Sequence, residues 1–229
     1  MGLRWPSQIS CPKLFAGLAT VPGVIRVLII DDHPAVRSGV ASVVRAEPGL
    51  VLVGSCSGVE EAVAVSGRTE VTVAVIDYDL GDGDGLNLCM RFRRRNIRTL
   101  IYSAYDERAL AAASQLAGAD GLLSKTAGGE ELCETIRRVA RGTAVFPQLD
   151  REVLEACASR VDEDDLPILG IMLDSRSRRD AAEALRLDEP EVERRLARMV
   201  DKLRPSTGPR RSVPAGATEG RHRASQLFE

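Results

Sequence analysis

Five side chains that can hold a metal ion and a phosphoryl group end four apolar segments of this 229-residue chain. Asp31 and Asp32 follow the first segment, Asp77 follows another, and Ser103 and Lys125 end two more. Carboxylates held close together repel one another unless a cation lies among them, and oxygen ligands of this kind suit magnesium. A hydroxyl and a lysine beside them would neutralise phosphoryl oxygens while a carboxylate attacks phosphorus. The residue types therefore predict metal-assisted phosphoryl transfer to a carboxylate.

Of these five residues, the lysine is the one least expected by chance at its position. Only three of the 31 basic residues of the chain are lysines, and Lys125 is the only lysine between positions 24 and 200. An aspartate at the end of a strand is often only a helix cap or a turn residue. We expect that structural role for Asp82 and Asp84, which lie in a glycine-rich loop.

Apolar runs alternate with helical patterns over residues 24–143, and these elements must position the site. Strands are expected at 25–30, 50–53, 71–76, 99–102 and 121–123, and helices at 34–47, 59–66, 86–95, 107–117 and 130–141. Unbroken apolar strands alternating with helices indicate a parallel sheet covered on both faces. The carboxyl ends of such strands carry the site. The sequence therefore predicts a five-stranded, parallel, doubly wound α/β domain.

The same segment resembles the receiver domain of two-component response regulators. The matching motifs are L-I-I-D-D-H-P, V-I-D-Y-D-L-G-D-G-D-G-L, Y-S-A and A-G-A-D-G-L-L-S-K, in the family's order and spacing. The resemblance implies a flavodoxin-like fold and a cytoplasmic regulator rather than an enzyme. It also implies a sensor histidine kinase as the partner that phosphorylates Asp77.

The resemblance assigns further roles around that aspartate. Asp32 and Asp77 would hold Mg²⁺, with Asp31 acting through water and the backbone carbonyl of Asp79 as a further ligand. The phosphoryl oxygens would be held by two residues, Ser103 and Lys125. The chain departs from the receiver pattern at Leu122, where an aromatic switch residue is usual, and at Gly81, where a proline is usual. Ser103 can still move toward a phosphoryl group, so a switch is expected without that aromatic residue.

Two other chemistries use the same aspartates. A calcium loop over 77–88 would need an acid at its twelfth position, where Leu88 stands, and is rejected. The D-x-D of Asp77 and Asp79 also resembles the haloacid-dehalogenase-type phosphatases. In those enzymes the acidic pair comes last in the chain, whereas here it comes first, which favours the receiver.

Residues 161–203 carry three amphipathic helical patterns and resemble the LuxR-type helix-turn-helix output domain of the NarL/FixJ subfamily. The predicted recognition helix spans about 189–202, and Arg186 stands where the preceding turn usually has glycine. The spacing of three arginines, Arg194, Arg195 and Arg198, predicts that they point outward, where they would contact DNA.

The charge of this domain leaves two functions open. It carries eight basic and twelve acidic residues, and Glu189, Glu191 and Glu193 begin the recognition helix. Asp188 and Glu191 have the spacing of a capping box, which would give Glu191 a structural role. We expect a dimer that binds DNA and regulates transcription. The alternative is a phosphorylation-dependent protein-interaction module that has lost DNA binding.

The remaining segments complete the expected organisation. Residues 1–23 are read as a disordered leader, 144–160 as a linker and 204–229 as a disordered basic tail. No apolar run is long enough to predict a membrane span. The five cysteines are far apart in the sequence and form no C-x-x-C pair, which fits a reducing cytosol.

Overall fold

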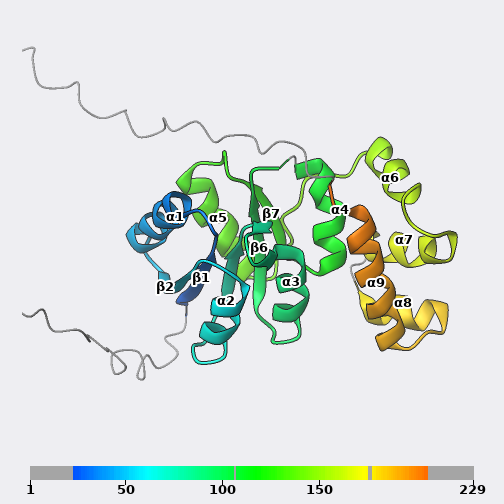
Figure 1. The fold of residues 1–229 in the computed structure, drawn as a ribbon, viewed down its shortest axis with the longest axis horizontal. Coiled ribbons are helices and arrows are strands. Elements are labelled where there is room, and N and C mark those ends of the chain that lie inside the picture. The colour runs from blue at the N-terminus through cyan, green and yellow to red at the C-terminus, as the bar shows by residue number, and fades with distance from the viewer. Residues whose placement is uncertain (1–22, 106, 175–176, 206–229) are drawn as a thin grey trace, which may run out of the picture.

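The computed structural model describes residues 23–105, 107–174 and 177–205. The predicted leader and most of the predicted tail lie outside these residues. A five-stranded parallel sheet in the order β2-β1-β3-β6-β7 forms the centre of the N-terminal part (Figure 1). Its strands are β1 (Ile25–Ile30), β2 (Leu50–Cys56), β3 (Val73–Ile76), β6 (Arg98–Ser103) and β7 (Gly121–Ser124). The predicted fold class is confirmed, because parallel pairing joins every neighbouring pair of strands.

Five helices cover both faces of this sheet, as expected from strands that are apolar on both sides. They are α1 (Pro34–Ala46), α2 (Val59–Ser66), α3 (Gly85–Arg93), α4 (Glu107–Ala117) and α5 (Gly129–Ala140). Helices α1 and α5 bury their apolar residues on one face, and α2, α3 and α4 bury theirs on the other. A short antiparallel hairpin between β3 and α3 was not predicted. It consists of β4 (Asp79–Leu80) and β5 (Gly83–Asp84).

Helices make up the regular structure of the C-terminal part. They are α6 (Arg151–Ala158), a 3-10 turn (Glu163–Asp165), α7 (Leu166–Asp174), α8 (Arg178–Leu185) and α9 (Glu189–Leu203). Helix α9 matches the predicted recognition helix to within one residue. Helix α6 lies inside the segment expected to be a linker. Among the described residues, no helix combines the length and apolar character needed to cross a bilayer.

Arg186 joins α8 to α9 in the left-handed conformation, with φ 54° and ψ 40°. This conformation explains why glycine is usual at the turn, since a residue with a Cβ atom is strained there. The next helix is capped as predicted, because the Asp188 carboxylate accepts a hydrogen bond from the Glu191 amide at 2.7 Å. The Glu191 carboxylate turns instead to Arg194 and Arg195, so its side chain does not complete the predicted capping box.

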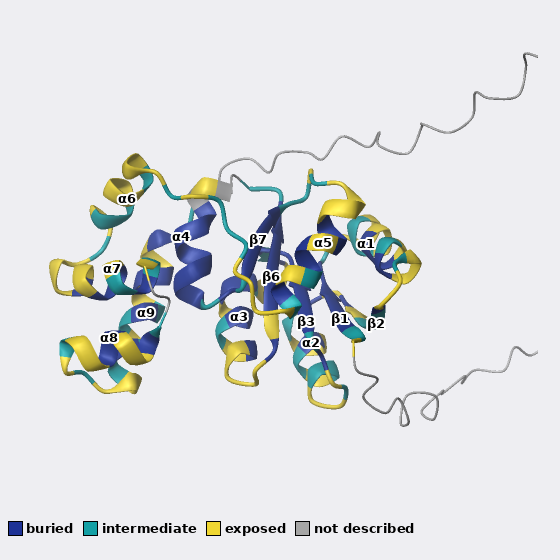
Figure 2. Cartoon of the chain, turned by 180° about the vertical axis from the view of Figure 1, so that it is seen from behind, coloured by how far each residue is buried: buried dark blue, intermediate teal, exposed yellow. Residues whose placement is uncertain are grey.

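Helix α4 joins the two parts of the molecule through one continuous apolar core. It packs along α9 (Figure 1), and Figure 2 shows it buried over most of its surface between the sheet and the C-terminal helices. The Arg178 guanidinium donates a hydrogen bond to the Leu116 carbonyl at 2.9 Å. Arg178 and Arg93 also pair with the Glu193 carboxylate, at 2.8 and 2.6 Å. Glu193 therefore faces the N-terminal domain and lies beside two cations.

Candidate functional site

The predicted site residues converge at the carboxyl ends of the strands. Asp31 follows β1, Asp77 follows β3 and Lys125 follows β7, and all three side chains are buried. The Lys125 ammonium lies 2.7 Å from a carboxylate oxygen of Asp31 and 2.7 Å from one of Asp77. A single buried cation thus bridges the two carboxylates, which compensates charges that would otherwise repel each other in a low-dielectric environment.

Burial controls the protonation of the central carboxyl. Burial, the largest cause, and the neighbouring Asp31 charge together raise the pKa of Asp77 from 3.8 to about 6, against the opposing effect of the nearby Lys125 ammonium. A carboxylate held in this way near neutral pH is ionised but poorly solvated. Such a group is suited to act as a nucleophile.

Four side chains at this edge offer ligand atoms for a metal ion. One atom each from Asp31, Asp32, His33 and Asp77 lies within 4.8 Å of the others. Three of the four donors are carboxylates, and hard oxygen donors of this kind suit Mg²⁺. The sequence interpretation missed His33, whose Nδ1 lies 2.6 Å from a carboxylate oxygen of Asp32. Its place directly after the acidic pair was the available signal.

The loop after β3 is held close behind the acceptor. The Gly85 amide donates a hydrogen bond to the Tyr78 carbonyl at 3.0 Å, and a Cβ atom at position 85 would collide with the Asp77 carbonyl oxygen. Asp79, whose carbonyl is an expected metal ligand, lies in this loop at the start of β4. The close packing explains why a glycine begins α3.

The two other acids of this loop have the expected structural roles. Asp82 accepts hydrogen bonds from the Val59 amide, at 2.8 and 3.0 Å, and so caps α2. Asp84 accepts one from the Leu86 amide at 2.6 Å and caps α3. The Asp84 carboxylate also forms an ion pair with Arg204, just beyond α9.

Ser103 is buried at the end of β6, where its hydroxyl accepts a hydrogen bond from the Tyr105 amide at 3.1 Å. The Tyr105 ring meets the Tyr78 ring edge-to-face, with centroids 5.1 Å apart. Leu122, at the position of the missing switch aromatic, is part of the apolar core. The aromatic contact beside Asp77 therefore comes from Tyr105, which the sequence interpretation did not single out.

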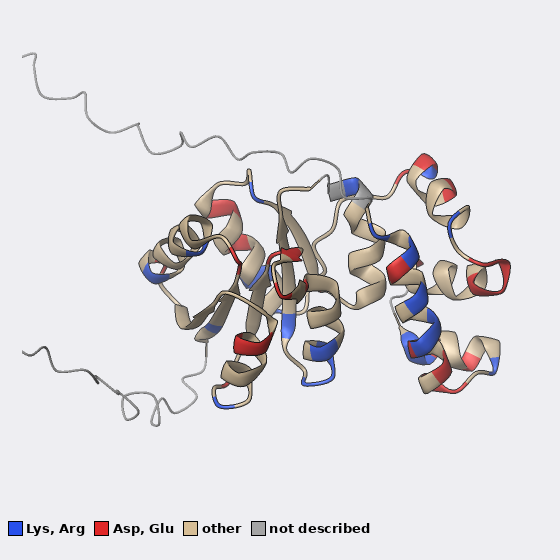
Figure 3. Ribbon diagram, in the orientation of Figure 1, with Lys and Arg blue, Asp and Glu red and all other residues tan. Residues whose placement is uncertain are grey.

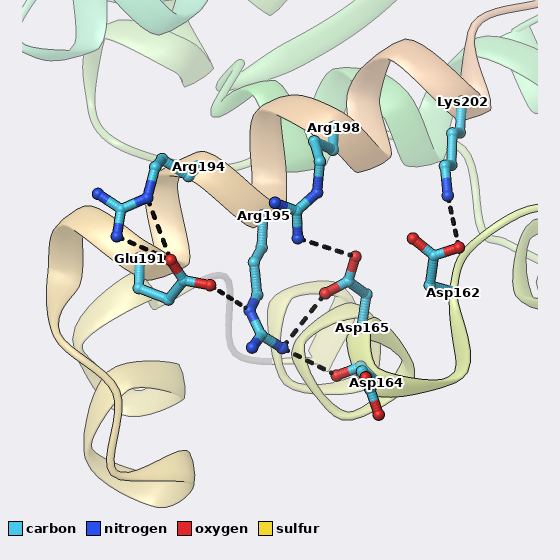
Figure 4. Close-up of polar contacts among 8 residues, drawn as sticks. All are labelled: Asp162, Asp164, Asp165, Glu191, Arg194, Arg195, Arg198 and Lys202. Atoms are coloured by element: carbon cyan, nitrogen blue, oxygen red, sulfur yellow. Dashed lines mark hydrogen bonds and ion pairs between the residues drawn. The ribbon is translucent and has the colours of Figure 1, made fainter.

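The three arginines expected to contact DNA lie on α9, but their surroundings differ. The side chains of Arg194 and Arg198 are 63% and 55% exposed, as the outward orientation predicts. Arg195 is 23% exposed and turns toward Asp165 and Glu191, so the prediction of an outward side chain is wrong for this residue. Figure 4 shows carboxylates facing all three guanidinium groups.

The sheet order and the bridged carboxylates are those of a phospho-acceptor receiver domain. A family model for the response regulator receiver domain matches residues 27–137. The chain is 29% identical over 192 residues to the DNA-binding transcriptional activator DevR/DosR of Mycobacterium tuberculosis. The match covers 79% of this chain and 88% of the relative. It is 28% identical over 189 residues to the nitrate/nitrite response regulator NarP of Escherichia coli, covering 78% and 88%.

Solved structures agree with this assignment. The receiver domain of the putative response regulator NarL from M. tuberculosis is 28% identical, with a TM-score of 0.51, and covers 53% of this chain and 99% of that one. An RcsB–DNA complex matches with a TM-score of 0.53 over 79% of this chain and 92% of that one; at 17% identity it shows the fold alone. Residues 27–137 form a response regulator receiver domain, and the chain as a whole is similar to response regulators of the NarL/FixJ type.

Proposed function

We propose that this chain is the regulator of a cytoplasmic two-component phosphorelay, in which a sensor histidine kinase phosphorylates Asp77 and the helical domain binds DNA as a dimer to regulate transcription. The observation that carries the first half is the Lys125 ammonium between Asp31 and Asp77, 2.7 Å from each. The same cation that compensates the two carboxylates would neutralise an incoming phosphoryl group.

The geometry supports a simple transfer reaction. A carboxylate oxygen of Asp77 attacks phosphorus, and the bond between phosphorus and the donor's histidine nitrogen breaks. Lys125 then pairs with the new phosphoryl group, and the Ser103 hydroxyl is available to donate to it. Asp31, Asp32, Asp77 and the Asp79 carbonyl would hold Mg²⁺, which neutralises phosphoryl oxygens when bound.

Mapping the phosphoryl group tests this half of the proposal. The full chain is incubated with Mg²⁺ and acetyl phosphate, and its peptides are analysed by mass spectrometry. We expect one hydroxylamine-sensitive phosphoryl group on the peptide that contains Asp77, and none in Asp77→Asn. Asp82→Asn is the matched control, because Asp82 caps α2 and should label like the parent. Full labelling of Asp77→Asn would contradict the assignment.

The DNA-binding half is supported by α9 and by the relatives. Arg194 and Arg198 are exposed cations on one helix, with Lys202 one turn further on. Cations at this spacing pair with successive phosphates of a duplex or reach a groove. DevR/DosR is described as a DNA-binding transcriptional activator, and RcsB has been solved on DNA. We propose the same class of ligand for this chain.

One observation favours the alternative of a protein-interaction module. Every arginine of the proposed DNA surface already has a carboxylate partner. Genome-wide chromatin precipitation with the tagged chain separates the two functions. DNA binding predicts discrete enriched sites that disappear in the double variant Arg194→Ala/Arg198→Ala and persist in Arg151→Ala, an exposed arginine of α6. Enrichment unaffected by the double variant, or absent from the parent, favours the interaction module.

A further inference from the structure

The arginines of α9 face carboxylates from the C-terminal domain itself. Figure 3 shows the basic residues along α9 and the acidic turn that precedes α7. This turn spans residues 162–165, has the sequence D-E-D-D and contains no basic residue. Since it belongs to the same domain as α9, its contacts do not depend on the receiver domain.

Ion pairs connect this acidic turn and Glu191 to the cations of α9 (Figure 4). The Glu191 carboxylate lies 2.7 Å from Arg194 and 2.7 Å from Arg195. Asp165 lies 3.4 Å from Arg195 and 3.8 Å from Arg198. One turn further along, Lys202 lies 2.7 Å from Asp162. The anionic oxygens thus follow the cations along the helix, as the phosphates of a nucleic acid backbone would.

The pairs differ in how easily a phosphate could replace them. The Asp165 side chain is only 3% exposed, so it needs a compensating cation, and Arg195 is its more enclosed partner. Arg194 is exposed, and its partner Glu191 lies at the solvent-facing start of the helix. Of the two carboxylates that pair with these arginines, Glu191 is 27% exposed and Asp165 only 3%, so DNA can displace Glu191 at the lower cost, whereas Arg195 is held by the buried Asp165.

We propose that α9 carries its own competitor for DNA. Glu191 occupies Arg194, and Asp165 of the acidic turn lies beside Arg198, so DNA must displace these carboxylates before its phosphates can bind the two arginines. Arg194 and Arg198 are then the cations that reach DNA, and Arg195 is a positioning residue that holds the turn against the helix. This inference rests on the proposed DNA-binding function and adds a regulatory contact to it.

The test compares two neighbouring glutamates of the same helix. Glu191→Gln removes the competing charge, whereas Glu189→Gln removes an equal charge from an exposed residue that makes no ion pair in the described structure. Binding of each full-length variant to a fluorescein-labelled duplex of mixed sequence is followed by anisotropy over a range of potassium chloride concentrations. The thermal midpoint of each variant verifies folding.

At low salt, Glu191→Gln should bind about two- to fivefold more tightly than Glu189→Gln, which is the effect of releasing exposed ion pairs. Its plot of log K against log salt should also be steeper, by nearly one unit for each arginine released. Equal affinities and slopes for the two variants, or weaker binding by Glu191→Gln, would contradict the proposal that Glu191 competes with DNA. The DNA-binding function would not be affected by that result. Absence of binding by the parent and both variants would overturn the DNA-binding function and, with it, this inference.

Discussion

The Lys125 ammonium and an Asp77 carboxylate oxygen lie 2.7 Å apart at the carboxyl edge of the sheet, although 48 residues separate them in the chain. The contact joins β3 to β7 and leaves Asp77 buried beside one cation. The contact affects both the stability of the chain and the chemistry of phosphoryl transfer.

Asp77→Asn should raise the free energy of unfolding at neutral pH in metal-free buffer. Because the native pKa of Asp77 is raised to about 6, the stability that this carboxyl contributes is fully present below its unfolded value of 3.8 and is lost as the pH rises through 6. The amide avoids that loss, so we expect a gain on the order of 1–3 kcal/mol above this range and little gain in acid. Urea unfolding at acidic and neutral pH measures it. Equal stability of parent and variant at neutral pH would contradict a buried, poorly solvated carboxylate at Asp77.

Asp32→Ala should weaken magnesium binding at least tenfold, since it removes one of the clustered carboxylates. Magnesium raises the thermal midpoint of a chain that binds it in the native state only, so a titration followed by thermal unfolding gives the affinity. Asp82→Asn is the control with the same loss of charge at a helix cap outside the cluster. If Asp32→Ala binds magnesium like the parent, Asp32 is not a ligand.

Arg186→Gly should stabilise the chain by about 1 kcal/mol, because glycine adopts the left-handed conformation of this turn without the strain of a Cβ atom. The same substitution at Arg179, within α8, should instead lower stability, since glycine disfavours helix. Thermal or urea unfolding of both variants provides the comparison. A destabilised Arg186→Gly would mean that the arginine makes a compensating contact.

Arg195→Gln should lower the urea midpoint of the chain clearly, whereas Arg194→Gln should leave the midpoint nearly unchanged. The first variant takes the nearer cation away from the buried Asp165, and the second removes an exposed pair. Urea unfolding of the two variants is the measurement. Equal effects would show that Arg195 does not have the positioning role assigned to it.

Local patterns were sufficient to predict the sheet, its order of elements and the convergence of Asp31, Asp77 and Lys125. Apolar runs define the strands, and a parallel sheet brings their ends to one edge. The Asp188 cap was likewise encoded in a few neighbouring residues.

Contacts between distant segments could not be predicted in the same way. Helical periodicity placed Arg195 on the outer face of α9, but its partner Asp165 is 30 residues away in the chain. Glu193 was placed at the start of the recognition helix, and only the packing of α9 on α4 brings its carboxylate to Arg93 and Arg178. Such pairs depend on how whole elements dock, which no local spacing reveals.

The most direct test of the account measures DNA binding with and without phosphorylation of Asp77. The parent chain and Asp77→Asn are each titrated against a duplex taken from an enriched chromatin site, before and after treatment with Mg²⁺ and acetyl phosphate. We predict that treatment strengthens binding by the parent, since a phosphorylated dimer engages two half-sites, and leaves Asp77→Asn unchanged. An equal response of both chains, or a parent whose binding does not respond, would contradict the account.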